Sequence, residues 1–330
     1  MNLLSLLPIV LILTRCSVIS YVVTKTSDIP EGRIIGGHQA KPHSHPYIVS
    51  LQLKFLWIRA HICGASLLNE RWVLTAAHCV SNSFLIRWLN MDAVAGAHDV
   101  NYYGSKAQIS KIIQRISHPD YTGGVGPNDV AVLKTENKFI FSQEIQPINL
   151  PMKMDLNNPD LMLPGWGALR TTYFIPDLPS NLQELKVTYV PYKKCKDKID
   201  RLLEGNEENP LVEDVNICTG PLRGGTAACS GDSGGPLVLR VPCPETVESI
   251  SIANDLPGDI GLTANNTETN VLLRSLKMNC FKRSTGNKEF FPVVLGIVSW
   301  GISPCGEKGA PTVFTNVSYY MEFIKSHIDS

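Results

Sequence analysis

Residues 231–236 read Gly-Asp-Ser-Gly-Gly-Pro, which places one serine in a turn made largely of glycine. With few side chains beside it, the backbone around Ser233 can approach a substrate carbonyl and point N–H groups at a developing oxyanion. Gly231 and Ser233 are the residues that could supply those N–H groups. Taken alone, the same turn could be an ordinary glycine-rich hairpin.

The apolar residues on either side of this turn fall into short runs. Val, Ile and Leu predominate, and Gly, Pro and Asn separate the runs at the spacing of strands and turns. The clearest runs are 48–53, 72–76, 130–133 and 293–300. Only 317–328 has helical spacing. The pattern therefore predicts an all-β chain with one helix at its C-terminal end.

Two further motifs carry groups that could act together with Ser233. His78 stands between small residues and a cysteine, in the sequence AAHC at 76–79, which is the fixed position that a general base requires. Asp129 leads into the apolar run 130–133, where a carboxylate needs a buried partner such as an imidazole N–H. Considered singly, the histidine could be inert and the aspartate could cap a turn.

Together, His78, Asp129 and Ser233, in that order along the chain, resemble the chymotrypsin/trypsin-type serine peptidases. The resemblance covers about residues 34–330 and also rests on IIGG at 34–37, TAAHC at 75–79, GWG at 165–167 and VSWG at 298–301. It implies two packed six-stranded antiparallel β-barrels, a C-terminal helix and a site in the cleft between the barrels. It also implies that Ser233 is the nucleophile, His78 the general base and Asp129 its orienting partner, with Gly231 and Ser233 forming the oxyanion hole.

The N-terminal residues predict export and activation by cleavage. Residues 1–20 are expected to be a signal peptide, because the apolar run 3–13 is too short to span a bilayer. A buried helix or a membrane anchor is the alternative. The resemblance implies that 21–33 is an activation propeptide, removed by a trypsin-like protease that cuts after Arg33. The new α-ammonium of Ile34 would then pair with Asp232 in a secreted peptidase domain spanning 34–330.

The nine cysteines are spread along the chain rather than clustered, which favours disulfides in an oxidising compartment. The resemblance implies the pairs Cys63–Cys79, Cys195–Cys218 and Cys229–Cys305. Loss of Cys16 with the signal peptide would leave Cys243 and Cys280, which we expect to form a fourth bridge.

An insertion at about 240–291 is the chief departure from the family, which usually has a short hairpin there. It could be an exosite that selects macromolecular substrates, a tolerated surface loop or an error in the gene model. Asn265 begins a glycosylation sequon within it, and Asn316 begins a second sequon near the C-terminal end.

Substrate preference follows from the pocket that the resemblance implies. Ala227 stands at its floor, where trypsin-like members place an aspartate that rewards Lys or Arg. Ser299, Trp300 and Gly301 would pair with the substrate backbone as an added strand, and Thr312 would narrow the pocket. These residues predict cleavage after Leu, Met, Ala or Val, with Phe and Tyr as further candidates.

Composition excludes several other classes of function. Thirty Lys plus Arg balance thirty Asp plus Glu in the 330 residues, so nothing draws the chain in bulk to nucleic acid or to anionic membranes. We expect no nucleic-acid partner, no membrane association of the mature form, and neither a metal nor another cofactor. The expected partners are protein or peptide substrates, the trypsin-like activating protease and protein inhibitors.

Two other functions compete with an endopeptidase. A non-catalytic binding protein on a peptidase scaffold would usually lack one of His78, Asp129 and Ser233, and all three are present. A lipase or esterase would carry its serine in a Gly-x-Ser-x-Gly elbow of an α/β chain, whereas the periodicity here is all-β.

Overall fold

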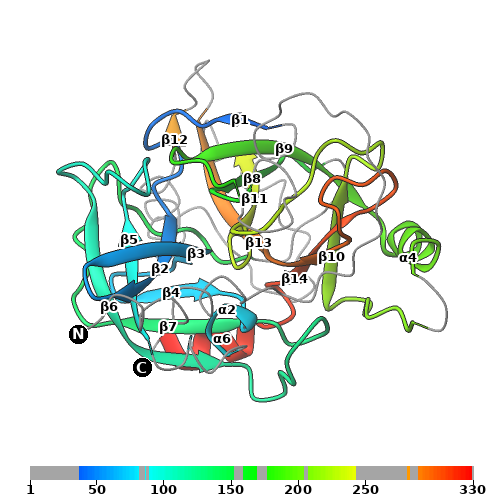
Figure 1. The fold of residues 1–330 in the computed structure, drawn as a ribbon, viewed down its shortest axis with the longest axis horizontal. Coiled ribbons are helices and arrows are strands. Elements are labelled where there is room, and N and C mark those ends of the chain that lie inside the picture. The colour runs from blue at the N-terminus through cyan, green and yellow to red at the C-terminus, as the bar shows by residue number, and fades with distance from the viewer. Residues whose placement is uncertain are drawn as a thin grey trace, which may run out of the picture.

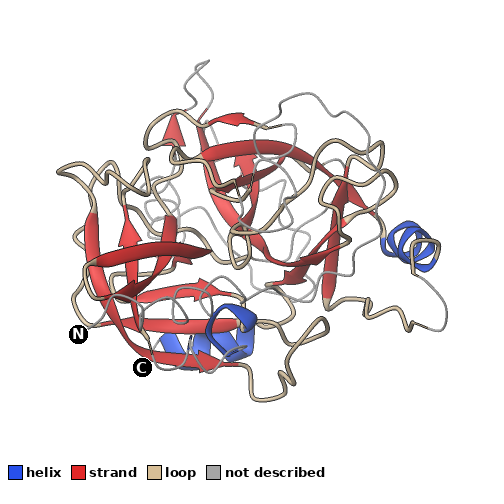
Figure 2. Cartoon of the chain, viewed as in Figure 1, coloured by secondary structure: helices blue, strands red, loops and turns tan. Residues whose placement is uncertain are grey.

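The computed structural model describes residues 37–81, 86, 89–151, 159–168, 177–203, 207–242, 281–282 and 289–328. Strands dominate this part of the chain, and the helices lie at its periphery (Figure 2). The all-β class is therefore confirmed.

Six strands from the N-terminal half close the first barrel (Figure 1), and every neighbouring pair is antiparallel. In spatial order they are β2 (Ile48–Phe55), β3 (Ile58–Leu67), β4 (Trp72–Thr75), β7 (Ala131–Thr135), β6 (Gln108–Ser117) and β5 (Asn90–Ala95). Alternate side chains fill the interior, among them Leu51, Leu74 and Leu133, which are fully buried.

The second barrel is built from the C-terminal half and is closed by the pairing of β8 with β9. In spatial order its strands are β8 (Leu161–Gly165), β9 (Gln183–Val190), β10 (Asn216–Gly220), β14 (Thr312–Asn316), β13 (Glu289–Gly301) and β11 (Pro236–Pro242). Two short strands extend this sheet: β1 (His38–Gln39) pairs with β9, and β12 (Phe281–Lys282) pairs with β13. The predicted pair of six-stranded barrels is thus present.

The two barrels share apolar contacts, so they form one packed body. Val238, Val294 and Ile297 of the second barrel belong to the same buried cluster as the interior of the first. Helix α6 (Met321–Ile328) places Ile324 in that cluster and packs beneath the first barrel (Figure 1). This shared core fixes the strand ends of one barrel against those of the other.

The prediction of a single helix was incomplete. Helix α6 begins at Met321 rather than at 317, because the N–H groups of Tyr319 and Tyr320 bond three residues back in successive turns. A second helix, α4 (Tyr192–Asp200), buries only Cys195 and Ile199, one turn apart, so its apolar face was too narrow to recognise. The one-turn α2 (His78–Ser81) follows β4.

Three of the predicted disulfides are present, and they join Cys63 to Cys79, Cys195 to Cys218 and Cys229 to Cys305. The pairing of β11 with β13 extends as far as Pro242 and Phe290. The first and last residues of the predicted 240–291 insertion are therefore part of these two strands. The predictions that concern residues 1–33, Ile34, Cys243, Asn265 and Cys280 lie outside the described residues. Within the described part of the chain, no helix is both long and apolar enough to cross a membrane.

Candidate active site

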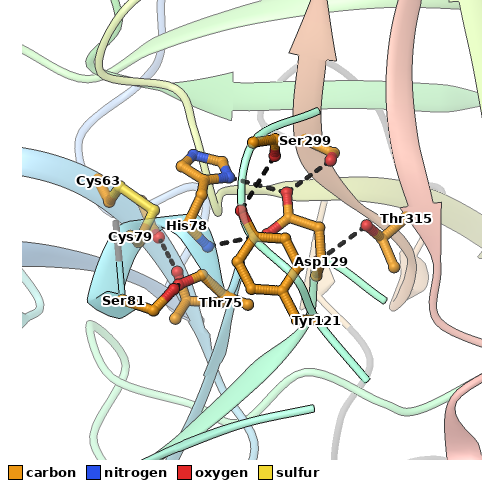
Figure 3. Close-up of polar contacts among 12 residues, drawn as sticks. Cys63, Thr75, His78, Cys79, Ser81, Tyr121, Asp129, Ser299 and Thr315 are labelled. Atoms are coloured by element: carbon orange, nitrogen blue, oxygen red, sulfur yellow. Dashed lines mark hydrogen bonds and ion pairs between the residues drawn. A yellow bond between two sulfur atoms is a disulfide. The ribbon is translucent and has the colours of Figure 1, made fainter. Parts of the chain in front are cut away.

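His78 and Asp129 are brought together by the register of two neighbouring strands. Thr75 at the end of β4 pairs with Ala131 at the start of β7, which places the residues just beyond these ends side by side. The His78 ring donates from Nδ1 to Asp129 Oδ2 over 2.8 Å, and the His78 backbone N–H donates to Oδ1 over 2.9 Å (Figure 3). Since a carboxylate accepts only, the Nδ1 atom carries the proton and Nε2 is left as an acceptor.

The second barrel holds Asp129 in place (Figure 3). Ser299 Oγ on β13 donates to Asp129 Oδ2 over 2.6 Å, and Thr315 Oγ1 on β14 donates to the Asp129 backbone carbonyl over 2.9 Å. The aspartate is only 1% exposed. Burial of a carboxylate is costly unless hydrogen bonds replace its water, and here three donors reach its two oxygens.

The residue before the aspartate is fixed by Tyr320, in the turn that precedes helix α6. Asn128 has a positive φ of 64°. Its N–H donates to the Tyr320 hydroxyl over 2.8 Å, and that hydroxyl donates to Asn128 Oδ1 over 2.9 Å. Tyr320 is therefore a positioning residue for the turn that carries Asp129.

The loop of Ser233 is fastened to the first barrel beside His78. The Ser233 carbonyl accepts the Gly64 N–H over 2.8 Å, and Gly64 follows Cys63, whose disulfide reaches the neighbour of His78. Gly234 has φ 75°, and a Cβ there would lie 2.1 Å from Thr75 Oγ1. The predicted glycine is thus required by close packing, and this packing brings the serine to the His78 end of β4.

His61 on β3 anchors the residue that the resemblance places in the oxyanion hole. Its Nε2–H donates to the Gly231 carbonyl over 2.9 Å, so its Nδ1 accepts from the Ser50 hydroxyl at 2.8 Å. Burial lowers the pKa of His61 to about 4, which keeps the ring neutral. Within the described residues, neither the N–H of Gly231 nor that of Ser233 donates a backbone hydrogen bond, so both are available to an anion.

Asp232, the residue before Ser233, is buried, and no cationic group among the described residues pairs with its carboxylate. Its Oδ1 accepts the Gly167 N–H over 2.8 Å, and its Oδ2 accepts the Cys229 N–H over 3.0 Å. A Cβ on Gly167 would lie 2.0 Å from Oδ2, which explains the glycine of the GWG motif. Burial raises the pKa of Asp232 to about 6, although the two N–H donors counteract the rise.

The predicted pocket residues come from neighbouring segments of the second barrel. Gly301 on β13 pairs with Thr312 on β14, and Thr312 is 6% exposed. The Thr312 Oγ1 accepts the N–H of Ala228 over 3.3 Å, so the threonine side chain is turned toward the segment that contains Ala227. The Cys229–Cys305 disulfide joins the segment that contains Ala227 to the segment after Gly301.

Two predicted residues are engaged in ways that the sequence did not indicate. The Ser299 hydroxyl binds Asp129, which leaves its backbone for the predicted strand pairing with substrate. The Asn316 side chain donates to the Asp214 carbonyl over 2.7 Å and accepts the Ser318 N–H over 3.1 Å. A glycan on Asn316 would be attached to the same Nδ2 atom, which keeps one hydrogen that could still make the first of these bonds.

The described residues contain one cluster of three possible metal ligands, formed by Cys63, His78 and Cys79. Both sulfurs belong to a disulfide, so neither is a thiolate that could bind a metal ion. The cluster is therefore a disulfide beside His78 and not a metal site.

Comparison with known proteins agrees with this geometry. The family model described as Trypsin matches residues 34–259. Lectizyme of Glossina austeni is 30% identical over 311 residues, which cover 91% of this chain and 88% of the relative. Duodenase-1 of Bos taurus is 36% identical over 213 residues (63% and 76%), and granzyme B of Rattus norvegicus is 33% identical over 211 residues (63% and 78%).

Two packed barrels with a histidine–aspartate pair beside a serine loop define a serine-type endopeptidase of the chymotrypsin/trypsin class. The chain belongs to the trypsin family, and it is a hydrolase that acts on proteins.

Proposed function

We propose that this protein is a secreted zymogen that, once activated, hydrolyses peptide bonds after apolar residues with Ser233, His78 and Asp129. The observation that carries the proposal is the hydrogen-bonded His78–Asp129 pair. Both barrels contribute bonds to this pair, and the loop that contains Ser233 is bonded to the first barrel close by. The three structural disulfides support an oxidising, extracellular location.

The proposed mechanism begins with proton transfer to His78. Because Nδ1 holds its proton for Asp129, the free Nε2 takes the proton of Ser233 as Oγ attacks the scissile carbonyl. The N–H groups of Gly231 and Ser233 stabilise the oxyanion, and the imidazolium gives its proton to the leaving amine. Water, activated by the same ring, then attacks the acyl-enzyme and restores the Ser233 hydroxyl.

Activation by cleavage after Arg33 is proposed because a cation beside the buried Asp232 carboxylate would stabilise its ionised form. With its pKa raised to about 6, the buried carboxyl binds a proton more tightly than an unfolded aspartate does. Its ionisation therefore destabilises the fold increasingly as pH rises from about 4 to about 6. An α-ammonium at Ile34 would offset that cost and hold the loop between Gly231 and Ser233 in its active geometry.

Replacing Arg33 with glutamine is expected to block activation by trypsin. Wild-type protein treated with trypsin should gain about 10²-fold or more in kcat/KM, the contribution of one oxyanion-hole donor, and its new N-terminus should be Ile34. The Arg33→Lys variant is the matched control, since trypsin also cuts after lysine, and it should activate normally. Equal activation of the Arg33→Gln variant would contradict the proposal.

An apolar substrate preference is proposed from the residues at the pocket. Ala227 offers no carboxylate for Lys or Arg. Thr312, which lies opposite Gly301 and accepts the Ala228 N–H, would narrow the space beside Gly301. The activating protease would be trypsin-like because it cuts after Arg33, and protein inhibitors would bind across the same cleft.

A peptide series ending in Arg, Phe, Leu or Ala measures this preference directly. The activated enzyme should turn over the Leu peptide faster than the Arg peptide. The Ala227→Asp variant should raise the Arg-to-Leu ratio of kcat/KM by about tenfold or more, the effect of one charge-assisted hydrogen bond. Dominant cleavage of the Arg peptide by the wild-type enzyme would refute the apolar pocket.

A further inference from the structure

The hairpin between β2 and β3 ends in four consecutive large apolar side chains that the described residues leave uncovered. We call Phe55, Leu56, Trp57 and Ile58 the apolar tip. Their exposed fractions are 40%, 63%, 82% and 57%. Large apolar side chains gathered at one exposed point are typical of an interaction site rather than of an ordinary surface.

The backbone of the apolar tip is also unfavourable for the residues that form it. Phe55 pairs with Ile58, so Leu56 and Trp57 make a two-residue turn, and Leu56 has φ 55°. Glycine suits the first position of such a turn, because it has no Cβ and tolerates a positive φ. Neither folding nor solubility explains Leu and Trp at these positions, and strain of this kind points to a function.

The shape of the tip favours a surface rather than a groove as its partner. β5 accompanies β2 only as far as the pair Lys54 and Asn90, so the tip projects one residue pair beyond the rim of the barrel. Ile113 on β6, 52% exposed, lies toward the same end of the barrel, two residues past Lys111. The apolar tip therefore projects from the barrel, and Ile113 adds a second exposed apolar side chain toward the same end.

The charges around the tip are mixed, with a small excess of cations. Asp92 lies opposite Lys111 on the neighbouring strand, and Glu136 donates its backbone N–H to the Lys111 carbonyl. Lys54 and Arg59 flank it in the sequence, and Lys111 lies on β6 toward the same rim. Asp92 neutralises Arg59 through a 2.8 Å contact, whereas neither Lys54 nor Lys111 has an ion-pair partner among the described residues. A tryptophan at the apex with lysines behind it matches the polarity of a bilayer interface, apolar inside and anionic at the headgroups.

We propose that the apolar tip is a membrane-docking element that inserts Leu56 and Trp57 into an anionic phospholipid surface. The overall charge of zero excludes bulk attraction to membranes, but it does not describe this local arrangement, and the proposal replaces our expectation of no membrane contact. Gly64, which binds the Ser233 loop, is six positions along β3 from Ile58, so the tip lies about 20 Å from the serine. Docking there leaves the catalytic residues free.

Vesicle sedimentation tests the proposal without any need for activity. The Ser233→Ala protein, which cannot digest itself, is mixed with phosphatidylcholine vesicles that contain or lack phosphatidylserine. We expect binding to the anionic vesicles and weaker binding to the neutral ones. Replacement of Lys54 by alanine should weaken the anionic binding about fivefold, the effect of one interfacial cation.

The double variant Leu56→Gly, Trp57→Asn removes the apolar side chains and supplies glycine at the position with the positive φ, so the turn should fold at least as well. It should lose about tenfold or more in vesicle affinity and keep its Tm. In an otherwise wild-type chain, it should also keep its activity on a small peptide. The matched control is Ile140→Ser, because Ile140 is 74% exposed but lies against Gln108, at the other end of β6. That variant should bind vesicles normally.

Several outcomes would overturn membrane docking. One is equal vesicle binding by the double variant and its parent, and another is no binding by the parent. Reversible dimerisation that the double variant abolishes, without vesicle binding, would assign the tip to a second copy. A selective loss of protein cleavage without vesicle binding would assign it to a protein partner. None of these results bears on the proposed catalytic residues.

Discussion

Ser233→Ala protein, cut after Arg33, is expected to lose about 10⁶-fold in kcat. The methyl group cannot attack a carbonyl, so the His78–Asp129 pair has no oxygen to activate. Initial rates on the best peptide of the series measure the loss. A fluorophosphonate probe gives a second readout, because it should label the wild-type enzyme and leave the variant unlabelled.

Ser105→Ala is the matched control, since Ser105 is an exposed serine of the first barrel. Its rates and its labelling should equal those of the wild type. Labelling that persists in the Ser233→Ala variant would place the nucleophile elsewhere. A wild-type protein that is cut at Ile34, yet inert to peptides and probe alike, would favour the non-catalytic binding protein.

The Asp129→Asn variant should lose about 10⁴-fold in kcat while remaining folded. Both carboxylate oxygens accept hydrogen bonds, Oδ1 from the His78 backbone and Oδ2 from the His78 ring. An asparagine must turn its NH₂ toward one of these donors, and the relief is a His78 tautomer with its proton on Nε2. That tautomer cannot take the proton of Ser233.

Ser299→Ala is the graded companion to this variant. It removes one of the three donors to the carboxylate but leaves the tautomer unchanged, so we expect a loss of about tenfold or less. Both variants are compared by kcat on one peptide and by Tm. Similar losses in the two variants would contradict a tautomer-fixing role for Asp129.

The sequence located the proposed catalytic residues because each stands in a short motif whose composition reflects local needs. The glycines around Ser233 are an example, since Gly234 has no room for a Cβ against Thr75. Asp129 could be selected because it precedes an apolar run, where a carboxylate needs a partner. Helix α4 was missed because only Cys195 and Ile199 form its buried face.

The residues that position the site had no such signature. His61 binds the Gly231 carbonyl across 170 residues of chain, and Tyr320 binds Asn128 across 192. Ser299 was expected to contribute backbone to substrate binding, yet its hydroxyl binds Asp129. These contacts depend on how one barrel is set against the other, which no local pattern encodes.

By itself, the sequence determined the all-β class, the three residues proposed for catalysis, and the pairing of six cysteines through the family it resembles. Local composition is enough for these, because a turn, a strand or a loop that holds a nucleophile requires particular residue types at neighbouring positions in the sequence. Only the tertiary structure decided which hydrogen bonds fix His78 and Asp129. Among the residues it describes, it also decided which carboxylate is buried without a cation and which apolar side chains stay uncovered. Burial and hydrogen bonding between distant segments exist only after the two barrels have packed together.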